Sequence, residues 1–151
     1  MSDKLTSPIQ IAAAGTALTS SAAPIGSVTF LGKLRNGFVH VDYTRHALST
    51  SGRPRIWIAV SRDAPPALGV AMATAAAAVT HWTGLDIGDG SSFSTGAVEM
   101  YYEALEFPTS SAATWVWTSI DLEGYWWMQV WIMDMDSAHP GTCGVFLTGG
   151  V

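Results

Sequence analysis

The stretch Tyr-Trp-Trp-Met-Gln-Val-Trp-Ile-Met-Asp-Met-Asp, residues 125–136, decides the fold class. It combines aromatic residues with Val and Ile and contains neither Gly nor Pro, which favours a β-strand. Successive side chains of a strand point to opposite faces, and here both faces are apolar. We therefore expect a strand covered on both sides, by a sheet partner, a loop or a neighbouring subunit.

Similar runs lie on either side of this stretch, and turn sequences separate them. The turns are Pro108-Thr-Ser-Ser, Glu123-Gly124 and His139-Pro-Gly, and the runs are 97–107, 114–122 and 143–148. Regularly spaced strands with turns between them are typical of a sandwich or barrel. We predict an all-β protein, an antiparallel β-sandwich.

The middle of the chain is less regular. We predict strands over 28–34 and 38–46, joined by a tight hairpin turn at Asn36-Gly37, and a strand over 55–61 that ends before Pro65. The Ala-rich segment 67–79 is expected to form a short helix or an irregular connection. Four glycines make 83–96 a long loop.

The first 26 residues show no alternation and no helical stripe. They consist mainly of Ala, Ser, Thr and Gly, with Pro8 and Pro24. This composition predicts an extended N-terminal arm over 1–26, followed by one β-sandwich domain over 27–151. In a free monomer we expect the arm to be disordered, whereas an assembly offers it a neighbouring subunit along which to lie, and the sequence leaves open whether it becomes ordered there.

Length and composition limit the class of protein. At 151 residues, with 48% hydrophobic and 13% charged residues, the chain is expected to fold as one domain. A single cysteine, Cys143, excludes an internal disulfide. The longest apolar run, 64–79, is interrupted by Pro65, Pro66 and Gly69, so we expect no membrane span.

Charge is divided unevenly along the chain. The first 62 residues carry all seven basic residues and a net charge of +5, whereas the remainder carries −10. There are two interpretations of this division. Either a positive face of one copy lies against a negative face of a neighbouring copy, or strands of both halves interleave in one sandwich and the charges mix in space. In the first case the electrostatic register would come from the arginines, namely Arg35, Arg45, Arg53, Arg55 and Arg62.

Seven tryptophans are many for one small core, because each indole needs a large buried surface and an acceptor for its N–H. We expect some of them to contact another chain or a ligand, since Trp is favoured at the centres of interfaces. The predicted interface residues all follow position 114: Trp115, Trp117, Trp126, Trp127, Trp131 and Met133.

Catalytic and metal-binding patterns are weak. His40 and His46 would share a strand face but lie about 20 Å apart, too far for one metal. Cys143 and His139 lack a third, orienting group, and the carboxylates after residue 98 suit a solvated face. We expect no enzymatic activity, cofactor or metal. The acidic total and an arm with only Lys4 also make nucleic-acid binding weak at most.

The order of these parts resembles jelly-roll virion structural proteins. The long strand over 125–136, the Ser/His/Pro/Gly turn and the short closing strand Cys-Gly-Val-Phe-Leu-Thr-Gly-Gly look like the last two strands of small viral coat subunits. The resemblance implies a jelly roll. That family often carries a basic arm for packaged RNA, which this chain lacks. A phage capsid decoration protein, which sits on the outside of a shell and needs no such arm, fits the acidic charge better.

The sequence therefore predicts a structural protein located in a virion, either a self-assembling coat subunit or a decoration subunit. Its partners would be copies of itself, as a homo-oligomer, or a capsid lattice. The alternative is a carbohydrate- or surface-binding module, in which Trp115, Trp117 and either Trp126 or Trp127 form an aromatic platform for sugar rings.

Overall fold

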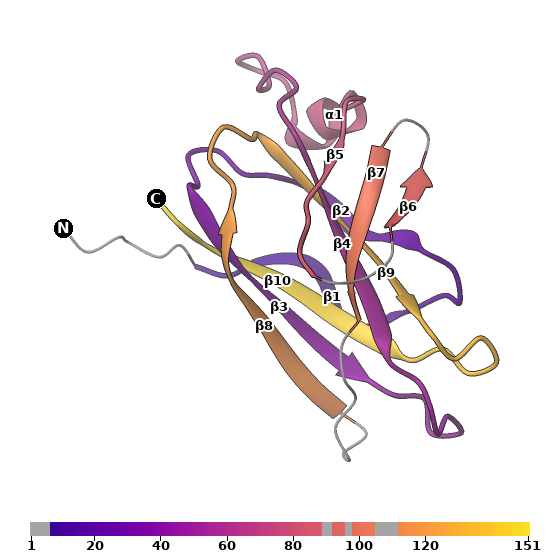
Figure 1. Ribbon diagram of the computed structural model, residues 1–151. Helices are drawn as coiled ribbons and strands as arrows, with labels where there is room; N and C mark the ends of the chain where they lie inside the picture. The colour runs from indigo at the N-terminus through magenta and orange to yellow at the C-terminus, as the bar shows by residue number, and fades with distance from the viewer. Residues whose placement is uncertain (1–6, 89–91, 96–97, 105–111) are drawn as a thin grey trace.

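The computed structural model describes residues 7–88, 92–95, 98–104 and 112–151. Two antiparallel sheets pack face to face, as Figure 1 shows, and almost all regular structure is β-strand. The predicted all-β sandwich is confirmed. The elements are β1 (Ile9–Ala17), β2 (Ala23–Phe30), β3 (Asn36–Thr44), β4 (Pro54–Ser61), α1 (Met72–Ala77), β5 (Thr83–Gly84), β6 (Ser92–Thr95), β7 (Val98–Ala104), β8 (Ala112–Asp121), β9 (Trp127–Asp134) and β10 (Thr142–Gly150).

The pairing of the strands is nested. One sheet has the order β1-β10-β3-β8 and the other β2-β9-β4-β7-β6, with β5 paired to β4. The first strand therefore pairs with the last, β2 with β9, β3 with β8 and β4 with β7. Successive pairs alternate between the two sheets. Strands from the basic and acidic halves thus interleave throughout the sandwich.

The core lies between the sheets and consists of the inward side chains of the central strands. On β9, Met128, Val130 and Ile132 are buried there, while Trp131 and Met133 point to the other face. Burial of each aliphatic side chain contributes about 1.5–3 kcal/mol. The prediction that both faces of this strand are apolar is confirmed, and β2 and β4 border it on either side.

The N-terminal segment differs from the predicted arm. Residues 9–17 and 23–30 are strands of the sandwich, and Ile11, Ala12 and Ile25 are buried in its core. Small residues permit this arrangement, because a Cβ on Gly26 would overlap the carbonyl oxygen of Ile11. The boundary predicted at residue 26 therefore falls inside β2.

The predicted hairpin at Asn36-Gly37 is wrong. Both residues lie in β3, and the chain crosses between sheets in the preceding connection, where Gly32 has φ +60°. Gly37 is closely packed, since a Cβ there would lie 2.7 Å from Leu122 Cδ1 and 2.9 Å from Leu147 Cδ1, and both leucine side chains would have to shift.

The long connection between β4 and β7 holds the one helix of the part that the structure describes. Helix α1 lies within the predicted Ala-rich connection, and β5 and β6 occupy parts of the predicted loop. The Asp63 carboxylate closes this connection by accepting the backbone N–H of Thr80 at 2.7 Å and of His81 at 3.2 Å. No helix within the described ranges is long and apolar enough to cross a membrane.

Candidate functional site

The outer face of the sheet β2-β9-β4-β7-β6 carries a row of aromatic side chains. Trp57 on β4 lies opposite Trp131 on β9 and opposite Tyr102 on β7. In the neighbouring row, Arg55 lies opposite Met133. We call these five residues the aromatic face. A solvent-facing sheet normally alternates with polar residues, so this composition indicates contact with something other than water.

The side chains of the aromatic face are held in place by one another. The rings of Trp57 and Tyr102 meet edge to face with centroids 5.5 Å apart, and the Arg55 guanidinium lies 4.6 Å from the Tyr102 centroid. The indole N–H of Trp131 donates to Oε1 of Gln129 at 3.0 Å. Trp57 is buried beneath its neighbours, whereas the other four members are half-buried.

The rest of the same sheet face is covered by the chain itself. Trp82, from the connection after β4, packs against the cluster that contains Trp57, and α1 contacts the edge strand β2. Met100 and Ala59 are buried in this cluster. Apart from the buried Trp57, the aromatic face is therefore a portion of this apolar sheet face that remains partly accessible among the described residues.

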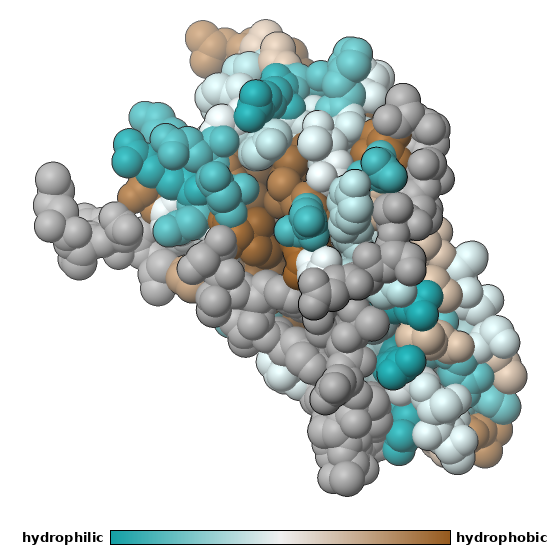
Figure 2. Space-filling model, viewed as in Figure 1, coloured by the Kyte–Doolittle hydropathy of each residue, from teal (hydrophilic) through white to brown (hydrophobic). Residues whose placement is uncertain are grey.

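Exposed hydrophobic residues also gather on the connection that leads into α1. Leu68, Val70 and Met72 are all exposed. In Figure 2, hydrophobic atoms appear at the top of the molecule, where Figure 1 places this connection. They form a second apolar surface, separate in sequence from the aromatic face, within the part of the chain that the structure describes.

The predicted interface residues do not form one patch. Trp131 and Met133 lie in the aromatic face, but Trp127 is only 1% exposed and packs against Phe30 with ring centroids 5.1 Å apart. Trp127 is thus a buried residue of the folded chain, which corrects its predicted place at an interface.

The predicted sugar platform is also divided between the sheets. Trp115 and Trp117 belong to β8 in the sheet with β3, and their side chains lie outside the described set. Trp126 precedes β9 and stacks on Phe30 at 5.9 Å with an interplanar angle of 4°. The sequence missed Trp57 and Tyr102 as members of the site, because only the strand pairing brings them beside Trp131.

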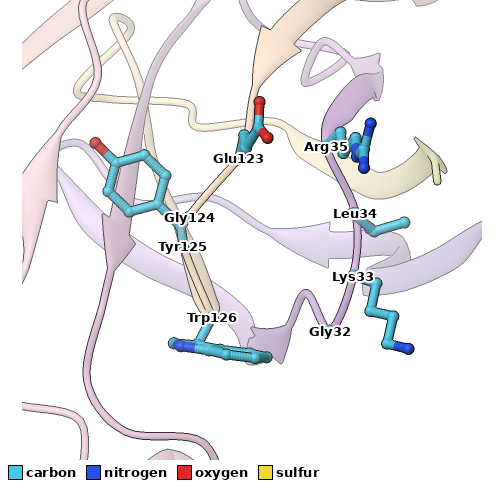
Figure 3. A pocket seen from close by; sticks show the side chains of 8 residues that line it. All are labelled: Gly32, Lys33, Leu34, Arg35, Glu123, Gly124, Tyr125 and Trp126. Atoms are coloured by element: carbon cyan, nitrogen blue, oxygen red, sulfur yellow. The ribbon is translucent and has the colours of Figure 1, made fainter.

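A pocket of about 250 Å³ lies between the turn before β3 and the turn before β9. The two turns are joined by a backbone bond from Leu31 N–H to Trp126 O at 2.7 Å and one from Leu122 N–H to Arg35 O at 2.9 Å. Figure 3 shows the Trp126 ring below the gap, while Tyr125 points away from it. The lining residues are Gly32, Lys33, Leu34, Arg35, Glu123, Gly124, Tyr125 and Trp126.

The five predicted register arginines are divided between three places. Arg45 and Arg53 flank the loop between β3 and β4, at one end of the sandwich. Arg35 precedes β3 and Arg62 follows β4, so both lie at the opposite end, where the Arg62 guanidinium is 4.8 Å from the Tyr125 centroid. Only Arg55 lies in the aromatic face, and the five form no single basic patch.

A buried carboxylate organises the end that carries Arg45 and Arg53. Asp134 is fully buried and accepts hydrogen bonds from the Tyr43 hydroxyl at 2.6 Å and from the N–H groups of Gly141 at 2.8 Å and Asp136 at 2.9 Å. Burial, followed by the bond to Asp134, raises the pKa of Tyr43 well above its usual range, so the phenol stays a donor. This arrangement joins β3, β9 and β10 and serves the fold.

Cys143 and His139 are the two residues that the sequence analysis considered as a nucleophile and a base. Cys143 is buried, and burial raises the pKa of its thiol to about 12, which keeps it protonated near neutral pH. The His139 ring lies beside that of His46, with ring centroids 5.2 Å apart. Within the described ranges, no group of three or more His, Cys, Asp or Glu side chains is placed to hold a metal ion. Glu106 lies outside the described residues.

Comparisons with known proteins found no relative of this chain. No protein-family model, curated protein or solved structure matches the chain.

Proposed function

We propose that the protein is a structural subunit of a virion, acting as a coat subunit or as a decoration subunit on a capsid lattice. The observation that carries the proposal is the nested strand order, in which a chain folded back on itself is rolled into two sheets. We infer from this nesting that the sandwich is a jelly roll, an architecture used by viral capsid proteins and by lectins. Since fold alone does not define function, the proposal also rests on the residues at the surface of the sandwich.

The aromatic face supports an interaction role. Trp131, Tyr102 and Met133 would be buried against a second copy or against the lattice, with the half-exposed Trp131 as the anchor. Arg55, stacked on Tyr102, supplies a charged group of fixed orientation at the edge of this surface. We assign association to this face and no catalytic step to the protein.

Light scattering on the purified protein tests self-association. We expect a mass well above the 16.0 kDa of one chain, and a return toward one chain in Trp131→Ser and in Met133→Ser. Trp126→Ser is the matched control, because it removes a half-buried indole away from the aromatic face and should leave the mass unchanged. A wild-type monomer would exclude a shell-forming subunit and leave the decoration role.

The second candidate is a carbohydrate-binding module. It is favoured by the sheet face on which Trp131 and Tyr102 are half-exposed, with Gln129 and Arg55 beside them as polar groups. Sugar rings stack on such aromatic surfaces while polar neighbours bind their hydroxyls. Tryptophan fluorescence titrated with a glycan panel tests it, since a saturable change that Trp131→Ala abolishes would support this candidate.

A further inference from the structure

Strand β8 forms one edge of the sheet β1-β10-β3-β8 and pairs only with β3 among the described strands. Figure 1 shows it along the border of this sheet. An edge strand presents a row of backbone N–H and C=O groups to which another strand can bind. At ten residues, β8 is the longest strand in the described part of the chain, so it offers an extended row of such groups.

Of the four sheet edges that the described strands form, the other three are protected. On one side of the sandwich, β1 and β2 lie so close together that a Cβ on Gly26 would overlap the carbonyl oxygen of Ile11. Register shifts also interrupt the pairing of both strands. On the other side, β6 is only four residues long. Covered, irregular or short edges are ways in which proteins prevent the addition of a foreign strand.

The sequence of β8 lacks these protective features. Its residues, Ala-Ala-Thr-Trp-Val-Trp-Thr-Ser-Ile-Asp, include no Pro, Gly or Lys, and the one charged residue, Asp121, is the last. Trp, Val, Thr and Ile all favour a strand. From Ala113 to Trp117 the pairing with β3 is regular, and the register shift lies beyond Trp117. Such a strand is suited to pairing with a further strand along its outer edge.

A second copy of the chain supplies a strand that fits this edge. Two β8 strands related by a twofold axis run antiparallel and present the same residues to each other, which is the self-complementary contact of a symmetric dimer. Their Asp121 residues then lie at opposite ends of the pair, so the contact brings no like charges together. Because the other three edges are protected, β8 of one copy is best matched by β8 of the next.

We infer that β8 pairs antiparallel with β8 of a second copy, which joins two four-stranded sheets into one sheet that crosses the dimer. Strand addition of this kind takes its affinity from main-chain hydrogen bonds. The contact deepens the proposed assembly role and rests on it, since a subunit with two different contact surfaces, β8 and the aromatic face, can extend a lattice.

Symmetry determines one feature of this contact. Val41 of β3 is buried in the core, so its partner Trp115 occupies a core-side position of β8, and positions 114 and 116 are on the outer face of the sheet. A twofold axis perpendicular to the sheet keeps outer positions opposite outer positions, so paired residues differ in number by an even count. One residue of β8 therefore lies opposite its own copy, with Cβ atoms about 4.5–5.5 Å apart.

Disulfide formation between copies tests this geometry. Single cysteines are placed in turn at each position from 113 to 117, oxidised and analysed on a non-reducing gel. We expect a linked dimer at one position and much less at the positions next to it, because only one residue lies opposite its own copy. Gln10→Cys, on the edge strand β1, should give none. Cys143 does not compete, because burial raises the pKa of its thiol to about 12. The absence of a linked dimer at all five positions would overturn the inference.

Light scattering separates this inference from the proposed function. Met133→Ser reduces the aromatic face and should leave a dimer, whereas Met133→Ser with Val116→Lys should be a single chain, because lysines on the two paired strands repel each other. Met133→Ser with Gln10→Lys carries the same added charge on β1 and should stay a dimer. A single chain in Met133→Ser alone would overturn the β8 contact and leave the aromatic face as the association surface. An assembly that Met133→Ser leaves unchanged and Val116→Lys dissociates would support β8 and refute association through the aromatic face.

Discussion

The hydroxyl of Tyr43 is the single polar group on which the Asp134 end most depends. Tyr43→Phe would remove the 2.6 Å bond and leave a fully buried carboxylate with one donor fewer. We expect the free energy of unfolding to fall by about 1–3 kcal/mol, because the buried carboxylate loses a donor that offsets its desolvation and keeps the N–H groups of Gly141 and Asp136. Chemical denaturation followed by tryptophan fluorescence measures this.

Thr114→Val is the control at the same scale. Thr114 Oγ donates to the Asp42 carboxylate at 2.7 Å, but this bond lies on the exposed surface. Water can replace the lost hydroxyl there, so the free energy of unfolding should fall by no more than about 0.5 kcal/mol. Equal losses of unfolding free energy in the two variants would show that burial does not account for the contribution of the Tyr43 hydrogen bond to stability.

At the scale of the element, β1 tests whether the N-terminal segment belongs to the sandwich. Ile11 is 3% exposed in the core, while its neighbour Gln10 points outward from the same strand. Ile11→Ser should lower the free energy of unfolding by about 2–4 kcal/mol, and Gln10→Ser by less than about 0.5 kcal/mol. Similar small effects in both variants, measured by thermal unfolding, would favour a loosely attached arm.

Element prediction succeeded where side chains were large and failed where they were small. The strands after residue 97 were predicted because aromatic and β-branched residues mark them, and β4 for the same reason. Strand β1 was missed because Ala and Gly dominate it, and its stability comes from pairing with β10. Asn36-Gly37 was misread as a turn, since the side chains that pack closely against Gly37, those of Leu122 and Leu147, are remote in sequence.

At the scale of the molecule, nested pairing determines both the site and the charge distribution. Trp131 and Met133 were predicted as interface residues from an apolar strand face, but their neighbours Trp57 and Tyr102 come from strands whose adjacency no local pattern encodes. Trp127 was assigned to the interface because a strand pattern shows that a face is apolar but does not show which residues of the same chain cover it. Here Phe30 of the neighbouring strand β2 packs against Trp127. The same nesting interleaves the basic and acidic halves.

This interleaving predicts how association responds to salt. The arginines lie at both ends of the sandwich and in the aromatic face, so no single basic surface faces a single acidic one. Association through Trp131, Tyr102 and Met133 would be driven by apolar burial, which salt does not screen. The mass measured by light scattering should therefore change little between about 50 mM and about 500 mM NaCl. Dissociation at the higher salt concentration would instead show that ion pairs between copies drive association. The residues to substitute first would then be Arg35, Arg45, Arg53 and Arg62.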